Sequence, residues 1–348
     1  MMKERNDFAR LRHALELRGR LGRPPVVELH VDRPVKEAYL GRPIAGPADE
    51  AEFWVGAGYD AVPVAVGILQ VGGVAGGQVG HKRRGQYTVY GDGESEIQWA
   101  SEGQGVIRSL DEVRSFAWPN PEQIDLSALE QIEPHLPPEM GLIAVIGKVF
   151  TPTWMLLGFE GFAEAWAFNR ELVAAVFERV IEIQWRTFER AIALPRVVGI
   201  WHPDDLAYGT GLLCSPAVFR EFVFPVYRRM GEVCRERGLS YVFHSDGDLR
   251  PVLDDLIACG FQGLHPLEPQ AMDAREVKAL TRGQLCLLGN IDVDRLARGT
   301  PEEIKALVRA NIRDLTDDGG YCVGSANSVT YYVPLANYQA MLEAAFEG

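Results

Sequence analysis

Eight short apolar runs constrain the fold of this chain more than any other feature of its sequence. Each run is followed by a segment in which apolar residues recur with a helical period. Apolar runs that alternate with helices are typical of parallel strands covered on both faces, and eight strands close a (β/α)8 TIM barrel. The runs are residues 26–30, 61–66, 142–148, 196–202, 241–244, 263–267, 285–291 and 321–325. The sequence therefore predicts an α/β fold built as a (β/α)8 barrel.

The helices between the runs carry clear start and stop signals. Residues 171–194 place apolar side chains near the 3.6-residue helical period, with charges between them. Ser215 and Pro216 form an N-cap and first-turn pair for a helix that runs to about Arg237. Thr300 and Pro301 begin another helix in the same way. These signals support the alternation of strands and helices.

One long glycine-rich stretch, residues 69–121, interrupts the alternation after the second run. Within it, residues 87–90 and 96–99 flank the turn-forming residues 91–93, which predicts a β-hairpin. Loops of this length are usually functional, so we expect an insertion that forms a lid over the barrel mouth. No internal repeat or linker divides the chain, and we expect one domain over residues 1–348.

Composition and charge exclude several classes of protein. Of the 348 residues, 47% are hydrophobic, enough for a large buried core. The net charge of −13 disfavours a nucleic-acid partner, because binding phosphates requires a basic face. Residues 81–84 form the one basic cluster, either a solvated loop or a lid that meets an anionic substrate.

The chain also lacks the features of a membrane or secreted protein. No segment approaches the roughly 20 apolar residues of a membrane helix, and the first twenty residues suggest an amphipathic surface helix without a signal core. The five scattered cysteines suggest reduced, mostly buried thiols, without the spacing of a disulfide framework or a thiolate zinc site. We expect a cytoplasmic protein.

Polar residues gather where the predicted strands end. In a (β/α)8 barrel the loops at the carboxyl ends of the strands build the active site, so this clustering favours an enzyme. The residues are Glu28 and His30 after the first strand, His202 and Asp204 after the fourth, His244 and Asp246 after the fifth, His265 in the sixth, Asn290 in the seventh and Asn327 after the eighth.

Two of these pairs share a spacing that is chemically informative. Residues i and i+2 of a strand share a face, so His244 points with Asp246, and His202 points with Asp204. Two such pairs bind a divalent metal through nitrogen and oxygen, or act as a general acid and base. The alternative is that the carboxylates cap the following helices and backbone groups satisfy the histidines. The spacing leaves these interpretations open.

Five stretches resemble the uroporphyrinogen decarboxylase superfamily, which also contains corrinoid-dependent methyltransferases. The resemblance covers most of the chain, is strongest in its second half and implies the same barrel. The stretches are residues 147–152, 204–229, 244–269, 287–304 and 319–341.

The chain departs from the pattern of the true decarboxylases in this superfamily. Those enzymes need no cofactor and hold an acidic tetrapyrrole with an Arg-containing motif after the first strand and an Asp near the second. Here residues 26–40 contain no paired arginines, residues 60–67 have no Asp at the position where the family's residue is expected, and Asn327 replaces a His. The carboxylates of a multiply anionic substrate would be left without partners, and burying unpaired charges costs free energy.

The methyltransferase branch is a better match. Some of its members hold zinc with a His-x-Cys motif after the fifth strand and a Cys in the last loop. The matching positions here are His244, Asp246 and Asn327, so the histidine remains and both thiolates are replaced. This change favours metal- or acid-assisted methyl transfer from an O- or N-methylated substrate, in which a metal or a protonated histidine stabilises the leaving group.

The resulting hypothesis is a methyltransferase that moves a methyl group between a small O- or N-methylated compound and a corrinoid protein. Uroporphyrinogen decarboxylation and a non-catalytic small-molecule binding barrel are the alternatives. The family resemblance also suggests a homodimer. The predicted catalytic residues are His244, Asp246, His202 and Asp204; the substrate-binding residues are Glu28, His30, Trp154, His265, Asn290 and Asn327; and the ligands of a divalent metal, for which zinc is one candidate, are His244, Asp246 and Glu28.

Overall fold

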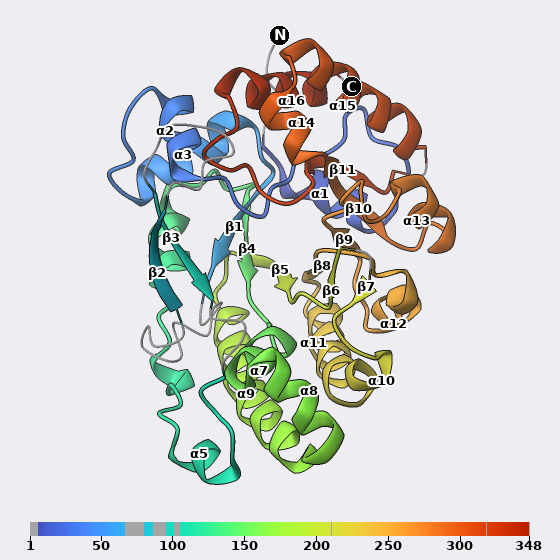
Figure 1. The fold of residues 1–348 in the computed structure, drawn as a ribbon. Helices are drawn as coiled ribbons and strands as arrows, with labels where there is room; N and C mark the ends of the chain where they lie inside the picture. The colour runs from blue at the N-terminus through green and yellow to red at the C-terminus, as the bar shows by residue number, and fades with distance from the viewer. Residues whose placement is uncertain are drawn as a thin grey trace.

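Seven parallel strands form one curled sheet in a computed structural model that describes residues 6–66, 80–85, 95–100, 105–209, 211–317 and 319–347 (Figure 1). Neighbouring strands pair in the order β1-β4-β5-β8-β9-β10-β11, all in parallel. These strands match seven of the eight predicted runs. Their bounds are β1 (Ala61–Ala65), β4 (Gly141–Val145), β5 (Val197–Pro203), β8 (Ser240–His244), β9 (Gly263–His265), β10 (Cys286–Ile291) and β11 (Tyr321–Ser325).

The first predicted run does not form a regular strand. One bridge joins Val26 to Val323 in β11, and a second joins Val31, just after the run, to Val329 beyond the end of β11. In a regular parallel ladder the Ser325 N–H would continue the pattern by donating to a backbone carbonyl of this run. The carboxyl of Glu28 accepts that N–H instead, at 2.7 Å, together with the Ser325 hydroxyl at 2.6 Å. A side chain thus replaces a backbone acceptor, and the hydrogen-bonded sheet has seven strands where the sequence predicts eight.

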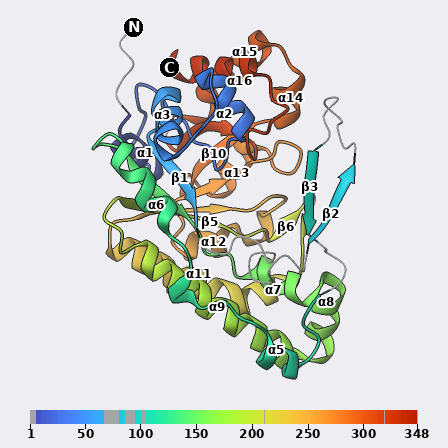
Figure 2. The ribbon, with the colours of Figure 1, turned by 90° about the vertical axis from the view of Figure 1, so that its left-hand side faces the viewer.

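Helices cover the outside of the sheet (Figures 1 and 2). None of the helices in the described ranges is long and apolar enough to cross a membrane. In the first half of the chain the helices are α1 (Phe8–Leu15), α2 (Arg33–Leu40), α3 (Pro47–Ala57), α5 (Leu110–Ser115), α6 (Ser127–Ile132), α7 (Phe150–Leu157), α8 (Phe159–Phe168) and α9 (Arg170–Ala191). In the second half they are α10 (Pro216–Val218), α11 (Phe224–Glu236), α12 (Leu253–Ala258), α13 (Ala274–Leu280), α14 (Val293–Arg298), α15 (Pro301–Leu315) and α16 (Leu335–Glu347).

The predicted helix starts are present. The Ser215 hydroxyl accepts the Ala217 N–H, and Thr300 forms a reciprocal capping box with Glu303 at the start of α15. The helix expected from residue 215 to about 237 is interrupted by one π-helical segment, η3 (Phe219–Val223), which joins α10 to α11. Side-chain capping groups therefore set these boundaries, as the local sequence indicates.

The two faces of the sheet bury different cores. The inner face carries Val145, Trp201, Val242 and Leu288, and the residues that alternate with them pack outward against the helices. Helix α1 closes the amino-terminal end of the strands, where Leu15 approaches Gly263, and is therefore partly buried rather than a free surface helix. Because successive residues of a strand face opposite sides, this alternation determines which side chains reach the mouth.

The predicted insertion is only partly described. A two-stranded antiparallel sheet pairs β2 (Gly80–Gly85) with β3 (Ser95–Ala100), whereas the predicted strand at residues 87–90 and its turn lie outside the described residues. Residues 96–99 lie in β3, but they pair with β2 and not with residues 87–90. The hairpin predicted from the sequence is therefore not confirmed. Figure 2 shows β2 and β3 on the same side of the molecule as α7 and α8, opposite α1.

Candidate functional site

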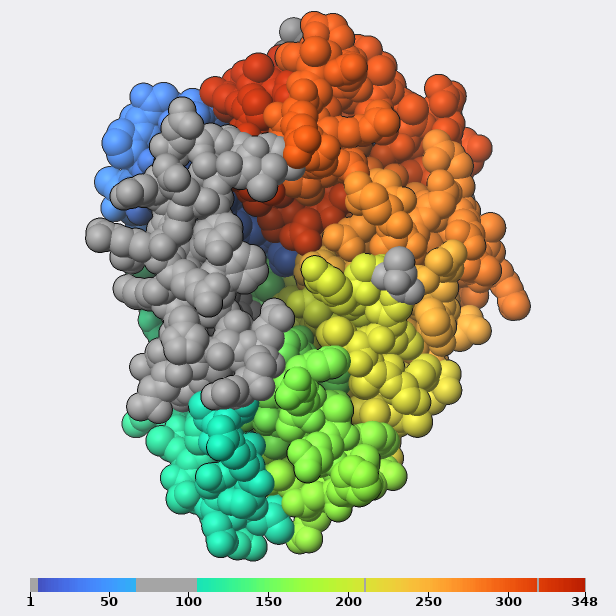
Figure 3. All heavy atoms as spheres, in the orientation of Figure 1, coloured from blue at the N-terminus to red at the C-terminus, as the bar shows by residue number. Residues whose placement is uncertain are grey.

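Three side chains meet at the carboxyl ends of β5 and β8. Figure 3 shows the surface in the orientation of Figure 1, with the orange and red C-terminal helices above the green segment that contains α7 and α8. His244 is the last residue of β8, and its Nε2 lies 3.8 Å from a carboxylate oxygen of Asp205 and 3.8 Å from one of Asp246. Each of the three residues offers one ligand atom, and these atoms all lie within 4.8 Å of one another. We call Asp205, His244 and Asp246 the mouth cluster.

The alternation of the strands explains why Asp205 belongs to this cluster. Trp201 lies on the inner face of β5, so residues 203 and 205 continue that face towards the mouth. Val242 does the same on β8, followed by His244 and Asp246. Sequence reasoning selected Asp204 instead of Asp205. Both faces of a parallel strand are apolar, so hydrophobicity gives no signal that separates the inner series from the outer one.

His202 and Asp204 lie on the outer face, between the sheet and the helices. Both are fully buried, and the Nδ1 of His202 lies 3.0 Å from the Tyr241 hydroxyl. The carboxylate of Asp204 accepts the backbone N–H groups of residues 149–151 at 2.6–2.8 Å and the Tyr227 hydroxyl at 2.8 Å. Asp204 therefore caps the start of α7, and the structure separates this pair from the mouth cluster.

Glu28 also lies apart from the mouth cluster. It shares a face with Val26, which packs in the outer core, and both of its oxygens accept hydrogen bonds from Ser325. Burial raises the pKa of Glu28 to about 8, although the bonds from Ser325 oppose the shift. Within the described residues, the group able to hold a metal consists of the mouth cluster without Glu28.

The remaining predicted residues have varied surroundings. Asn327 lies at the mouth, where its amide donates to Asp246 at 2.9 Å. Asn290 donates to the Leu267 carbonyl and accepts from Asn311 on α15. The side chain of His30 is 60% exposed and pairs with Asp32 at 3.1 Å. Trp154, on α7, packs edge-on against Phe159.

Asp246 binds a proton more readily than His244 does at the mouth. Burial lowers the pKa of His244 to about 4, with Asp205 opposing the shift and Lys148 adding to it, so this imidazole is neutral at pH 7. Burial and the charges of Asp205 and Glu268 raise the pKa of Asp246 to about 7. The mouth therefore holds a neutral base beside a carboxylic acid that titrates near neutrality.

His265 supports His244 from the adjacent strand. The two residues are register partners on β8 and β9, and their Nδ1 atoms lie 2.8 Å apart. Burial and the neighbouring His244 hold the pKa of His265 well below its usual value, so both rings are neutral at pH 7. One Nδ1 therefore carries the proton and donates it to the Nδ1 of the other ring. The contact fixes the plane of the His244 ring and leaves its Nε2 facing the two carboxylates.

The donor set of the mouth cluster fits a divalent cation. One imidazole nitrogen and two carboxylate oxygens are ligands that zinc and harder divalent metals accept. Two ligands at zinc distances are about 3.4 Å apart in a tetrahedral site, close to the 3.8 Å separations observed here. The residues present can therefore hold such a metal with small adjustments.

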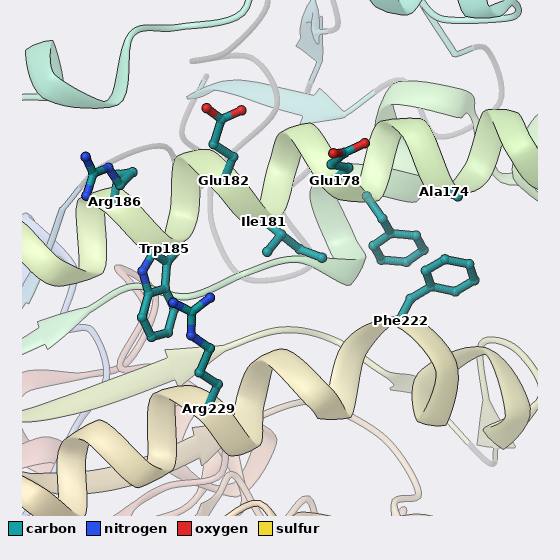
Figure 4. A pocket seen from close by; sticks show the side chains of 9 residues that line it. Ala174, Glu178, Ile181, Glu182, Trp185, Arg186, Phe222 and Arg229 are labelled. Carbon is teal, nitrogen blue, oxygen red and sulfur yellow. The ribbon is translucent and has the colours of Figure 1, made fainter.

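A separate groove lies on the outer wall of the molecule, between α9 and the helix that contains Phe222 (Figure 4). It encloses about 470 Å³ and is lined by residues such as Phe177, Ile181 and Trp185, with the Arg229 guanidinium 3.6 Å from the Trp185 ring centroid. None of the predicted site residues lines this groove. The groove is therefore separate from the mouth cluster.

Comparisons with known proteins agree with this fold. The profile described as uroporphyrinogen decarboxylase (URO-D) matches residues 103–347. A methyltransferase structure from Methanosarcina mazei covers 97% of this chain and 97% of its own, with a TM-score of 0.71 and 19% sequence identity. At that identity the match shows a shared fold.

Two curated relatives match parts of the chain. A methylated-thiol–coenzyme M methyltransferase of Methanosarcina mazei is 30% identical over 136 residues, which is 39% of this chain and 34% of the relative. The methylcobamide:CoM methyltransferase MtaA of Methanosarcina barkeri is 25% identical over 228 residues, 64% of this chain and 62% of the relative. The chain thus matches less than two thirds of the length of either relative. The family profile, in contrast, spans well over half of this sequence, and the chain belongs to the uroporphyrinogen decarboxylase (URO-D) family.

Proposed function

We propose that this protein is a methyltransferase that moves a methyl group between a small O- or N-methylated substrate and a corrinoid protein. The mouth cluster carries the proposal, because it places a neutral imidazole and two carboxylates at the end of the sheet where enzymes of this fold bind substrates. The relatives named as methyltransferases support the reaction class. We also propose that residues 26–32 occupy the eighth strand position and complete the barrel.

The proposed reaction requires the leaving atom to be neutralised. The methyl carbon passes to the cobalt of the reduced corrinoid as a carbon–cobalt bond forms and the carbon–oxygen or carbon–nitrogen bond breaks. The electron pair of the broken bond remains on the oxygen or nitrogen, which then takes a proton. Asp246 holds a proton near pH 7 and is the donor in this proposal, whereas His244 is neutral and does not supply it.

A divalent metal is an alternative to that proton. Asp205, His244 and Asp246 would hold it, and as a Lewis acid it would stabilise negative charge on the leaving atom. Asp246 cannot carry a proton and ligate a metal through the same oxygen, so the two routes exclude each other. His265 and Asn327 position the cluster in either case, because they contact His244 and Asp246 directly.

The test is methyl transfer to free cob(I)alamin. The protein is incubated with cob(I)alamin and a panel of methoxy-aromatic and methylammonium compounds, and the absorbance of methylcobalamin is followed. We expect transfer from at least one compound and its loss in His244→Ala. His135→Ala, an exposed histidine outside the mouth, is the matched control and retains activity. Formation of coproporphyrinogen from uroporphyrinogen without methylcobalamin would assign decarboxylation instead, and ligand binding without turnover would assign a binding barrel.

A further inference from the structure

His265 is an enclosed residue that reaches the mouth cluster only through His244. It ends β9 beside its register partner His244 on β8, and it has no solvent-exposed surface. The Trp201 ring packs against it at an interplanar angle of 90°, with ring centroids 4.9 Å apart, and a Cβ added at Gly289 would lie 3.6 Å from its Cδ2. Within the described residues, His265 is not part of the group able to hold a metal.

The two histidine rings meet edge to edge. Their Nδ1 atoms are 2.8 Å apart, whereas the ring centroids are 5.0 Å apart and the ring planes differ by 28°. The nitrogens are much closer than the centroids, so each Nδ1 points at the other ring. The N–H and the lone pair of an imidazole lie in the ring plane, and this arrangement aligns them. A single proton therefore lies between the rings, and either ring can be its donor.

The distances at the mouth indicate which ring donates. Nε2 of His244 lies 3.8 Å from an oxygen of Asp205 and 3.8 Å from one of Asp246. A ring N–H that donates to a carboxylate approaches it to about 2.7 to 2.9 Å. Neither carboxylate is that close, which indicates a bare Nε2, and a neutral ring with a bare Nε2 carries its proton on Nδ1. Nε2 of His265 makes no hydrogen bond within the described residues in either arrangement, so it favours neither.

We propose that His265 is a positioning residue that accepts a hydrogen bond from the Nδ1–H of His244 and so keeps the Nε2 lone pair of His244 available to a divalent cation. This inference rests on the metal-assisted form of the proposed function. A histidine that ligates a metal usually donates its other N–H to a carboxylate, a carbonyl or water. Here an imidazole takes that place, and it adds no negative charge to a cluster that already contains two carboxylates.

The first test is the tautomer of His244 in chelator-treated protein. Long-range ¹H–¹⁵N NMR of protein labelled with ¹⁵N-histidine distinguishes a protonated ring nitrogen from a bare one, and the signals lost in His244→Ala and His265→Asn assign the two rings. We expect a protonated Nδ1 and a bare Nε2 in His244. Added Zn²⁺ should shift the Nε2 signal and leave the proton on Nδ1. A His244 ring protonated on Nε2, or a ring spectrum that Zn²⁺ leaves unchanged, would overturn the proposal.

The second test is calorimetric titration of chelator-treated variants with Zn²⁺. His265→Leu removes the acceptor and should weaken zinc binding by about tenfold or more. His265→Asn places an acceptor oxygen near the position of Nδ1 and should retain most of the affinity. His202→Leu is the matched control, because it removes another fully buried histidine whose hydrogen bond with Tyr241 lies on the outer face. Its zinc affinity should equal that of the wild type.

The comparison of these variants separates positioning from general support of the fold. Wild-type zinc affinity in His265→Leu, or an equal loss in His202→Leu, would contradict the proposal. The tautomer of the wild-type protein decides alone if His265→Leu does not fold. Neither measurement uses a corrinoid or a methylated substrate. Methyl transfer by a protein whose His244 is protonated on Nε2 would keep the function and refute the inference, and the expected tautomer and zinc dependence without methyl transfer would do the reverse.

Discussion

Two pairs of residues with the same spacing have different surroundings in this molecule. His202 and Asp204 end β5, and His244 and Asp246 end the neighbouring β8. The first pair is fully buried among aromatic rings and caps a helix. The second pair faces another carboxylate at the mouth, where the side chain of Asp246 is 33% exposed. The same motif is structural in one strand and chemically available in the next.

The cause is the register between the two strands. Pro203 pairs with His244, and His202 pairs with Phe243, so the two histidines are offset by one residue. A one-residue offset moves a side chain to the opposite face of a sheet. A His-x-Asp motif at a strand end is therefore informative only when the face is known. Five predictions test this difference, from the largest expected effect to the smallest.

Asp204→Ala should destabilise the protein far more than Asp246→Ala. The first change leaves three backbone N–H groups and the Tyr227 hydroxyl buried without their acceptor, a loss of roughly 3 to 5 kcal/mol. The second removes a partly exposed carboxyl and should cost about 1 kcal/mol or less. Urea unfolding measures both variants. Equal losses would contradict the structural role assigned to the outer pair.

His244→Ala should lower the rate of methyl transfer by about two orders of magnitude, and it should also cost about 1 to 3 kcal/mol of stability because the buried His265 loses its hydrogen-bond partner. His202→Phe should lower stability without lowering the rate, because it removes the hydrogen bond with Tyr241 inside an aromatic cluster but nothing at the mouth. Rates with cob(I)alamin and unfolding curves on the same preparations separate the two effects. A His202→Phe protein that is folded but inactive would place this residue in the reaction after all.

The rate of chelator-treated protein should fall as pH rises through about 7. The pKa of Asp246 is raised to about 7, so the acid form is present below that pH and is lost above it, by about tenfold per pH unit. Asp246→Asn should be slower throughout and should lack this limb. The measurement is a pH–rate profile of both proteins. An unchanged profile in the variant would exclude Asp246 as the proton donor.

Zinc affinity should depend on Asp205 and not on Glu28. Asp205→Asn replaces one carboxylate of the mouth cluster and should weaken zinc binding by about tenfold or more. Glu28→Gln removes a carboxyl that is bound to Ser325 and should leave the affinity unchanged. Calorimetric titration of chelator-treated proteins provides the comparison. Weaker binding in Glu28→Gln alone would restore the ligand set expected from the sequence.

The contribution of Glu28 to the free energy of unfolding should depend on pH. Its pKa is raised from 4.5 to about 8, so the folded protein binds a proton that the unfolded chain has released. The stabilisation linked to this group is fully present below pH 4.5 and is lost as pH rises to about 8, with a slope of at most about 1.4 kcal/mol per pH unit. Unfolding of Glu28→Gln between pH 5 and 8.5 should lack that contribution. A slope identical to that of the wild type would show that Glu28 is ionised in the fold.

Most of the fold could be predicted because its signals are local. Apolar runs of strand length became seven parallel strands, and capping residues such as Ser215 and Thr300 begin helices where expected. The apolar composition of the first run correctly predicted that its first residues are buried, but not that the run lacks regular strand pairing. Its pairing depends on Ser325, almost 300 residues away, and a local pattern contains no information about that contact.

The sequence by itself determined that histidines and carboxylates stand at the ends of parallel strands, and the topology of such a sheet gathers those ends at one mouth. Only the tertiary structure decided that His244, Asp246 and Asp205 meet there, that Asp204 caps the start of α7, and that Glu28 binds Ser325. The physical reason is the burial of both faces of every strand. Inner and outer residues are equally apolar along most of each strand, so only the register between strands distinguishes them.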